Sequence, residues 1–210
     1  MRNAGYHVRL RPTAPLPMPA RLPACLSLQP HPANPATAVD AVAVSVDLGA
    51  DGGLQLRYTL SHDGRLRIPP ARPPGAADGL WAHTCCEVFV AVAGDTAYRE
   101  FNFSPSGQWA VYDFADYRRR APDTALPPPR VDSHDDGTAL HLSATLPATA
   151  LPAVPRGRLL MLGLSVVSED ADGALQYWAL RHPTAQADFH DRRSFALALA
   201  LPAATTREHA

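Results

Sequence analysis

The chain has 210 residues, of which 46% are hydrophobic and 19% are charged, and its formal net charge is -1. This length suits one domain with a sizeable core, and the balanced charge provides no broad basic surface for a nucleic-acid backbone. All 19 basic residues are arginines, which excludes chemistry that depends on a lysine, such as Schiff-base formation.

The beginning of the chain is rich in proline and poor in candidate core residues. We expect residues 1–25 to form a disordered or loosely docked extension, because such a composition buries too little apolar surface to order itself. The predicted domain covers 26–202, and a flexible tail follows over 203–210. No segment reaches the ~18 apolar residues of a membrane span, and no signal peptide is recognisable. We therefore expect a cytoplasmic protein with neither a membrane nor a nucleic-acid partner.

Beyond Pro35, apolar residues recur with a period of two in short runs bounded by Gly, Pro and Asp. This pattern is typical of strands joined by tight turns, and only one short helix is expected, around 149–154. Sequential hairpins at this spacing predict an all-β fold, a two-sheet antiparallel β-sandwich. The expected strands are 41–48, 54–60, 65–68, 85–93, 98–103, 108–114, 139–146, 159–167, 174–180 and 195–201.

The expected strand 85–93 carries an isolated acid. Side chains of a strand alternate between its two faces, so Cys86 and Val88 share one face while Glu87 and Phe89 point to the other. Three cysteines are an odd number, and neighbours in a strand point apart, which argues against a disulfide framework. The strand therefore places one carboxylate beside an aromatic ring, opposite a core face.

Two later strands also have informative patterns on their two faces. In 98–103, Phe101 lies on the apolar face, whereas Glu100 and Asn102 lie on the other face. If this strand pairs with 85–93, Asn102 lies across from the acid of that strand. The strand 159–167 is apolar on both faces, which is typical of a central strand that is covered on both sides.

Several ordered motifs resemble the DOMON-like bacterial proteins, which are related to family 9 carbohydrate-binding modules. The similarity extends over about 26–201, and each motif alone is weak while their order is specific. The resemblance implies a β-sandwich with a ligand site on one face. The motifs are Leu80-Trp81-x-His83-Thr84-Cys85-x-Glu87-x-Phe89, Glu100-Phe101-Asn102-Phe103-Ser104-Pro105-Ser106-Gly107-x-Trp109-Ala110, Tyr177-Trp178-Ala179-Leu180 and Asp188-Phe189-His190.

This resemblance also implies site residues, because family 9 modules hold a terminal sugar between two tryptophan rings and bond its hydroxyls with polar side chains. Trp81 matches the first ring and Glu87 the acid. Asn102 stands where a longer polar group is usual, and Phe189 stands where the second tryptophan is expected. Val167 replaces a hydrogen-bonding glutamine. The metal-associated N-terminal part of those modules has no counterpart in this sequence, so calcium is not inferred.

The candidate ligand-binding residues are therefore Trp81, Glu87, Asn102 and Phe189. An exposed indole ring stacks well on the C–H face of a sugar ring; the alternative is that Trp81 caps the end of the core. His83, Tyr112 and His190 are supporting candidates, and His83 is expected to hold the tryptophan loop through a carbonyl. The histidines show no zinc-binding spacing, so no metal is predicted.

Haem binding and catalysis are two alternatives to sugar binding. Some DOMON relatives hold haem between a methionine and a histidine, for which Met161 with His182 or His190 would be needed; no cofactor is the favoured expectation. Glycoside hydrolysis needs two facing carboxyl groups, for which Glu87 and Glu100 are the near neighbours, and no enzymatic activity is predicted. The leading hypothesis is a non-catalytic binding domain for a small carbohydrate-like ligand, with haem binding or protein interaction as alternatives and the oligomeric state left open.

Overall fold

The computed structural model describes residues 18–35 and 38–201, so most of the extension predicted for 1–25 and the tail predicted for 203–210 lie outside the described residues. Strands dominate this part of the chain, and its helical elements are three single turns of 3-10 helix. The strands are β1 (Ala24–Pro30), β2 (Val39–Leu48), β3 (Leu54–His62), β4 (Gly75–Ala76), β5 (Cys85–Val92), β6 (Tyr98–Phe103), β7 (Gln108–Asp116), β8 (Arg119–Arg120), β9 (Arg130–Asp135), β10 (Ala139–Leu146), β11 (Leu160–Glu169), β12 (Leu175–Ala179) and β13 (Leu197–Leu199). The turns are η1 (Leu80–Ala82), η2 (Ala148–Ala150) and η3 (Arg192–Ser194).

Hydrogen bonds join the strands into one continuous path in the order β4-β7-β6-β5-β11-β12-β1-β2-β3-β10-β9. β1 connects two halves, because residues 24–28 pair with β2 and residues 29–30 pair with β12. We call β1, β2, β3, β10 and β9 the β3 half, and β12, β11, β5, β6, β7 and β4 the β5 half. The strands that we expected in two separate sheets thus belong to one curled sheet, since one strand takes part in both halves.

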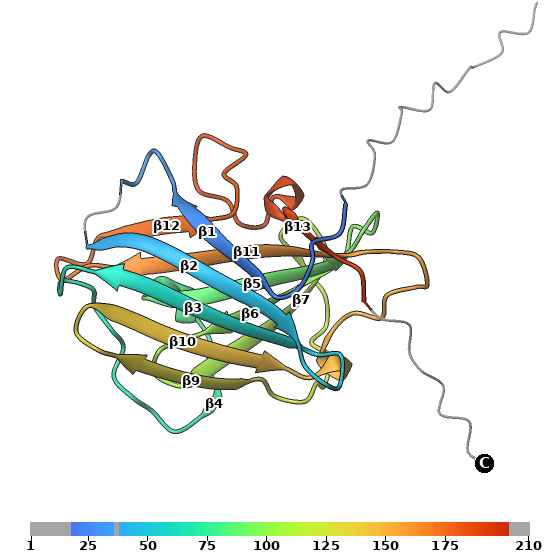
Figure 1. Ribbon diagram of the computed structural model, residues 1–210, viewed down its shortest axis with the longest axis horizontal. Coiled ribbons are helices and arrows are strands. Elements are labelled where there is room, and N and C mark those ends of the chain that lie inside the picture. Colours follow the sequence, from blue (N-terminus) through green and yellow to red (C-terminus); the bar gives the residue numbers. More distant parts are fainter. Residues whose placement is uncertain (1–17, 36–37, 202–210) are drawn as a thin grey trace, which may run out of the picture.

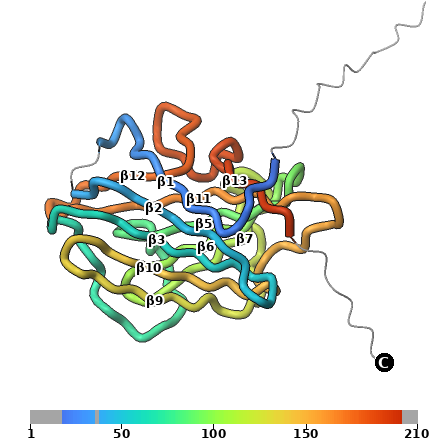
Figure 2. Tube along the Cα trace, viewed as in Figure 1, coloured from blue at the N-terminus to red at the C-terminus, as the bar shows by residue number. Residues whose placement is uncertain are grey.

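The two halves enclose a shared hydrophobic core. Figures 1 and 2 show β2, β3 and β10 lying across β5 and β6. Alternate residues of both halves point into the space between them and are buried there, among them Tyr58 and Leu142 from the β3 half and Val88, Phe101 and Leu162 from the β5 half. Burial of this apolar surface is the main stabilising contribution to the fold.

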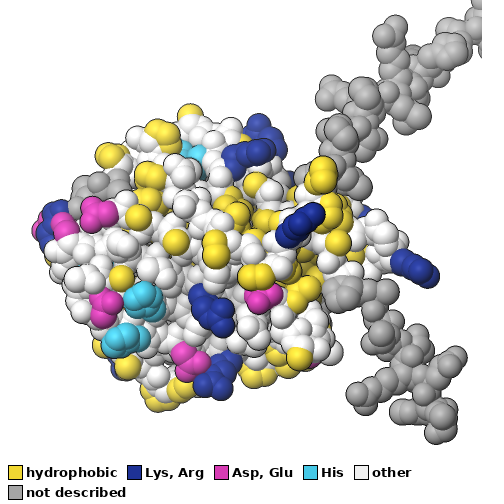
Figure 3. All heavy atoms as spheres, in the orientation of Figure 1, with side chains coloured by type: hydrophobic (Ala, Val, Ile, Leu, Met, Phe, Trp, Pro, Cys, Tyr) yellow, Lys and Arg dark blue, Asp and Glu magenta, His cyan; other side chains and the backbone are white. Residues whose placement is uncertain are grey.

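The outer faces of the two halves differ. Burial alternates along β10, as expected for a strand with one face in solvent, and polar, charged and histidine side chains are spread over the face seen in Figure 3. Every residue of β5 is buried. A second group of apolar residues, here called the aromatic cluster, covers part of the outer face of the β5 half. Its buried members are Phe89, Ala91, Tyr98, Ala110, Tyr112, Phe114 and Phe195.

The all-β prediction is confirmed, and the strands 98–103 and 139–146 have the predicted bounds. The predicted faces of β5 and β6 are also confirmed, because Cys86, Val88 and Phe101 lie in the shared core while Phe89 lies in the aromatic cluster. The central position of β11 is confirmed, since it pairs with β5, β12 and β13.

Some local predictions were wrong. Residues 65–68 form no strand and contribute only an isolated bridge between Leu66 and Asp170. The helix expected around 149–154 is the single turn η2, because the prolines on both sides prevent a longer one. β1 and β9 were missed, since β1 lies in a proline-rich segment and the exposed β9 shows little alternation. Within the described residues, no helix is long and apolar enough to cross a membrane.

Candidate functional site

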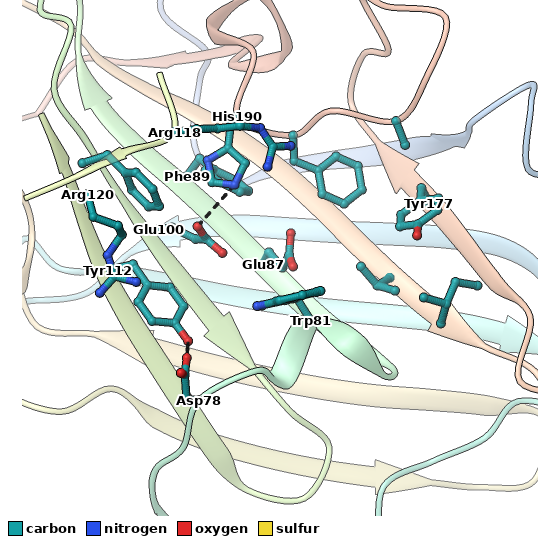
Figure 4. A pocket seen from close by; sticks show the side chains of 15 residues that line it. Asp78, Trp81, Glu87, Phe89, Glu100, Tyr112, Arg118, Arg120, Tyr177 and His190 are labelled. Carbon is teal, nitrogen blue, oxygen red and sulfur yellow. Dashed lines mark hydrogen bonds and ion pairs between the residues drawn. The ribbon is translucent and has the colours of Figure 1, made fainter. Parts of the chain in front are cut away.

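A pocket of about 550 Å³ lies on the outer face of the β5 half. Its floor is formed by outward side chains of neighbouring strands: Phe89 and Glu87 from β5, Glu100 from β6 and Tyr112 from β7. The pocket walls come from the η1 turn, from β12 and from the loop before η3. Figure 4 shows the two glutamates between Trp81 on one side and His190 on the other.

Trp81 stands at the side of the pocket with 55% of its surface exposed. Its turn begins after Gly79, whose φ of 69° is readily adopted by a residue without a side chain. The turn is anchored on its other side, because His83 Nδ1 lies 2.7 Å from Glu169 Oε2 and the Thr84 hydroxyl donates to the Arg67 carbonyl. A fixed backbone therefore presents a largely exposed indole ring.

Glu87 is buried at the floor, with 2% of its surface exposed. Ser165 of β11 lies directly opposite in the strand register, and its hydroxyl donates to Glu87 Oε2 over 3.0 Å. Burial raises the pKa of Glu87 well above its usual range, and the nearby carboxylate of Glu100 raises this pKa further. The protonated, neutral form is therefore favoured.

Glu100 is the second acid of the floor and is 5% exposed. The Asn102 side-chain amide donates to Glu100 Oε1 over 2.8 Å. Burial raises the pKa of Glu100 to about 7, although the Asn102 hydrogen bond and the positive charges of Arg120 and Arg118 lower it. At neutral pH this group therefore exchanges between its protonated and ionised forms.

His190 faces Glu100 from the opposite wall, with Nε2 at 3.8 Å from Glu100 Oε2. The Tyr98 hydroxyl accepts a hydrogen bond from the Arg118 backbone N–H, so we assign its own proton to the bond of 2.9 Å with His190 Nδ1. This assignment leaves the imidazole proton on Nε2, toward the pocket. Burial, and secondarily the charge of Arg118, lower the pKa of His190 to about 4, so the ring is neutral at neutral pH.

Aromatic rings line most of the remaining surface, contributed by Phe89, Phe114, Tyr177 and Phe189. The rings of Tyr177 and Phe189 meet at 66° with their centroids 6.0 Å apart. On the central strand β11, Gly163 makes room for the neighbouring aromatic cluster, because an added Cβ would lie 2.9 Å from the Phe195 ring. The pocket thus combines broad apolar contact with two deeply placed polar groups, as ligand sites commonly do.

The rim of the pocket carries charged residues that already have partners. The Arg118 guanidinium lies 3.0 Å from Asp188. The Arg120 guanidinium lies 2.8 Å from Asp123 and 4.2 Å from the centre of the Tyr112 ring. On the same side, the Tyr112 hydroxyl donates to Asp78.

Five of the residues singled out from the sequence line the pocket: Trp81, Glu87, Phe189, Tyr112 and His190. Asn102 pairs with Glu87 in the register, as expected, but its side chain is fully buried beside Glu100 and does not line the pocket. His83 also lies outside the pocket lining, and it contacts the carboxylate of Glu169 instead of the expected carbonyl.

Sequence reasoning did not select Glu100 as a site residue, although the alternation of the strand placed it on the correct face. The rim residues Asp78, Arg118 and Arg120 were also missed as pocket residues. A run of three arginines after a strand is typical of a solvated turn, but the pairing of β8 with β7 brings Arg118 and Arg120 back over the sheet.

The positions of the histidine and methionine side chains bear on the alternatives of a metal site or a haem site. Among residues 18–35 and 38–201, no group of three or more His, Cys, Asp or Glu side chains is placed to hold a metal ion. Met161 lines a separate pocket with Arg192 and Phe195, whereas His190 lines the large pocket. The His182 ring is bonded to the Gln29 carbonyl. The prediction that no cofactor is bound remains a prediction.

No known protein family matches the sequence, and no curated protein matches it. Solved structures do match. A candidate carbohydrate-binding protein from Bacteroides uniformis has a TM-score of 0.66 and 17% identity, over 84% of this chain and 85% of its own. A family 9 carbohydrate-binding module from Caldicellulosiruptor kristjanssonii, solved in complex with cellotriose, has a TM-score of 0.51 and 9% identity, over 76% of this chain and 74% of its own. The chain therefore shares the fold of these proteins.

Proposed function

We propose that the protein binds a small carbohydrate in the pocket of the β5 half and does not transform it. One observation carries this proposal: the exposed ring of Trp81 stands beside a pocket whose floor presents two buried carboxyl groups. A flat ring is suited to the C–H face of a sugar, and carboxyl groups are suited to its hydroxyls. The fold supports the proposal, because a module of the same fold was solved with cellotriose.

Each residue has a distinct part in the proposed complex. Trp81 stacks on one face of the sugar, and the rings of Tyr177 and Phe189 bound the opposite side. Glu87 and Glu100 bond the hydroxyls at the floor. The volume of about 550 Å³ lies within the usual range of small-molecule sites. Asn102, which we first considered a ligand contact, is reassigned as the residue that orients Glu100.

We expect no hydrolysis at the floor acids. Hydrolysis by two carboxyl groups requires them to flank the glycosidic bond, with one as a base or a nucleophile while the other donates a proton. Glu87 and Glu100 both extend from neighbouring strands of the pocket floor, on one side of the proposed sugar. We therefore expect no release of p-nitrophenol from aryl glycosides, and a turnover abolished by Glu87→Gln or Glu100→Gln would contradict this expectation.

Calorimetric titration with glucose, cellobiose and a panel of other neutral mono- and disaccharides tests the proposal. We expect at least one sugar to bind and Trp81→Ala to weaken it tenfold or more, about 1.4 kcal/mol. Trp81→Phe retains a flat ring and is the matched control, for which we expect a smaller loss. If wild type and Trp81→Ala behave identically across the panel, the proposed function is wrong.

Some expectations from the sequence stay predictions beside this proposal. A cytoplasmic location and the DOMON-like resemblance are two of them. Haem binding, the alternative from a different class, predicts a Soret band in protein purified from haem-supplemented cells. Interaction of the aromatic face with another protein predicts concentration-dependent association in size-exclusion chromatography.

A further inference from the structure

The floor of the pocket holds two acids without a basic partner. Among the described residues, the hydrogen-bond partners of the two carboxyl groups are the neutral side chains of Ser165 and Asn102. His190 approaches Glu100 Oε2 only to 3.8 Å, which is too long for a hydrogen bond. One oxygen of each buried carboxyl group therefore has no hydrogen-bond partner in the described part of the chain.

The positive charges nearby are committed elsewhere. Arg118 pairs with Asp188, and Arg120 pairs with Asp123 at the rim. Both arginines lower the pKa of Glu100 through space, yet burial has the larger effect and raises it. His190 is neutral at neutral pH because burial lowers its pKa to about 4. A buried charge in a protein is normally paired or neutralised, and the hydrogen bonds of these two arginines go to Asp188 and Asp123 instead of the floor acids.

The space between the acids suits a small cation. Glu87 and Glu100 extend from adjacent antiparallel strands and face the same pocket (Figure 4), two residue pairs apart in the register, with Glu100 opposite Phe89. An ammonium group carries three N–H donors and one positive charge, so its donors are sufficient for both carboxyl groups. The faces of nearby rings, including Trp81 and Phe89, also attract a cation.

We propose that the ligand of this pocket carries a protonated primary amine that lies between the carboxylates of Glu87 and Glu100. This inference rests on the proposed function and narrows its ligand class to amino sugars. No bond of the ligand forms or breaks: one proton held by the glutamate pair leaves to solvent when the ammonium group takes its place, so the charge balance of the pocket is kept. A neutral sugar leaves that proton on the protein.

The experiment compares D-glucosamine, D-glucose and N-acetyl-D-glucosamine near neutral pH by calorimetry in two buffers with different ionisation enthalpies. We expect glucosamine to bind at least tenfold tighter than glucose, and acetylation of the amine to abolish this preference. The measured enthalpy should depend on the buffer for glucosamine, because a proton is released, and should not for glucose. Equal binding of glucosamine and glucose would overturn the inference while leaving the proposed function intact.

Two variants test whether Glu87 and Glu100 cause the preference for glucosamine. Glu87→Gln and Glu100→Gln keep the shape and the acceptor oxygen, so each should reduce the preference for glucosamine, and the double variant should remove it. Asp132→Asn on the exposed strand β9 is the control, because it removes the same charge away from the pocket. A preference that survives in a folded double variant, judged by its thermal unfolding, would also overturn the inference.

Cyclohexylamine, an amine without hydroxyl groups, separates the two proposals further. Suppose that cyclohexylamine binds to wild type but not to the double variant, and that no sugar binds. This result would support the cation site and refute the carbohydrate function. Binding of none of these probes would refute both proposals.

Discussion

The outer faces of the two halves of the sheet differ in how far they are covered by other parts of the protein. On the β3 half, strand β10 alternates between buried and exposed residues, and its outward side chains face solvent. On the β5 half, β5 is buried along its whole length beneath the aromatic cluster and the loop that precedes η3. A sheet face that is covered by protein excludes water, and on the β5 half this desolvation raises the pKa of both Glu87 and Glu100.

The largest effect should come from removing a ring of the aromatic cluster. Phe89→Ala is expected to lower the free energy of unfolding by about 3–5 kcal/mol, because Phe89 is buried and a cavity would remain. Thr145→Ala on the exposed face of β10 is the comparison in the β3 half. It should alter the free energy of unfolding by less than ~0.5 kcal/mol. Denaturant unfolding measures both values. Similar values for the two variants would contradict the difference between the faces.

Next in size is the dependence of stability on pH caused by Glu100. Its pKa rises from 4.5 in the unfolded chain to about 7 in the folded protein, so the folded state retains a proton that the unfolded state loses. This contribution is complete below pH 4.5 and is lost as pH rises to about 7, on the order of 3 kcal/mol. Glu100→Gln should remove it.

His190 acts in the opposite direction, because its pKa falls from 6.5 to about 4 and its contribution is lost as pH falls through that range. The test is therefore the difference between wild type and Glu100→Gln, measured by thermal unfolding at a series of pH values. We expect the variant to gain stability relative to wild type as pH rises from 4.5 to 7. Parallel curves would show that Glu100 titrates normally in the folded state.

A smaller effect is expected at the central strand. Gly163→Ala places a Cβ at 2.9 Å from the Phe195 ring, so the ring must shift. We expect a loss of about 1–3 kcal/mol, typical of overpacking. Phe195→Leu in the same background should recover part of the loss if that contact is the cause. A fully stable Gly163→Ala variant would indicate that the loop over this face adapts freely.

The smallest effect on stability is expected at Trp81. Because 55% of its surface is exposed, Trp81→Ala should change the free energy of unfolding by less than about 1 kcal/mol, while sugar binding is lost. A large loss of stability would favour the alternative from the sequence, in which this ring caps the core.

The sequence by itself determined the all-β class, the bounds of strands such as β6 and the face on which Glu87, Phe89 and Glu100 lie. These features are local, because the alternation of side chains along a strand follows from its backbone geometry. The sequence left two positions open for Trp81, on the pocket or as a cap on the core, and the structure places its ring with 55% of its surface exposed.

Only the tertiary structure decided which of these residues meet. The path of β1 through both halves, the loop that carries Phe189 and His190 over the sheet, and the return of Arg118 and Arg120 to the rim depend on contacts between distant parts of the chain. Asn102 and Glu100 illustrate the limit of prediction from the sequence. The alternation of the strand placed both side chains on the outer face, but only the structure shows that Glu100 lines the pocket while Asn102 is buried beside it and supports it. The raised pKa values of the two acids have the same origin, because desolvation depends on everything that packs above them.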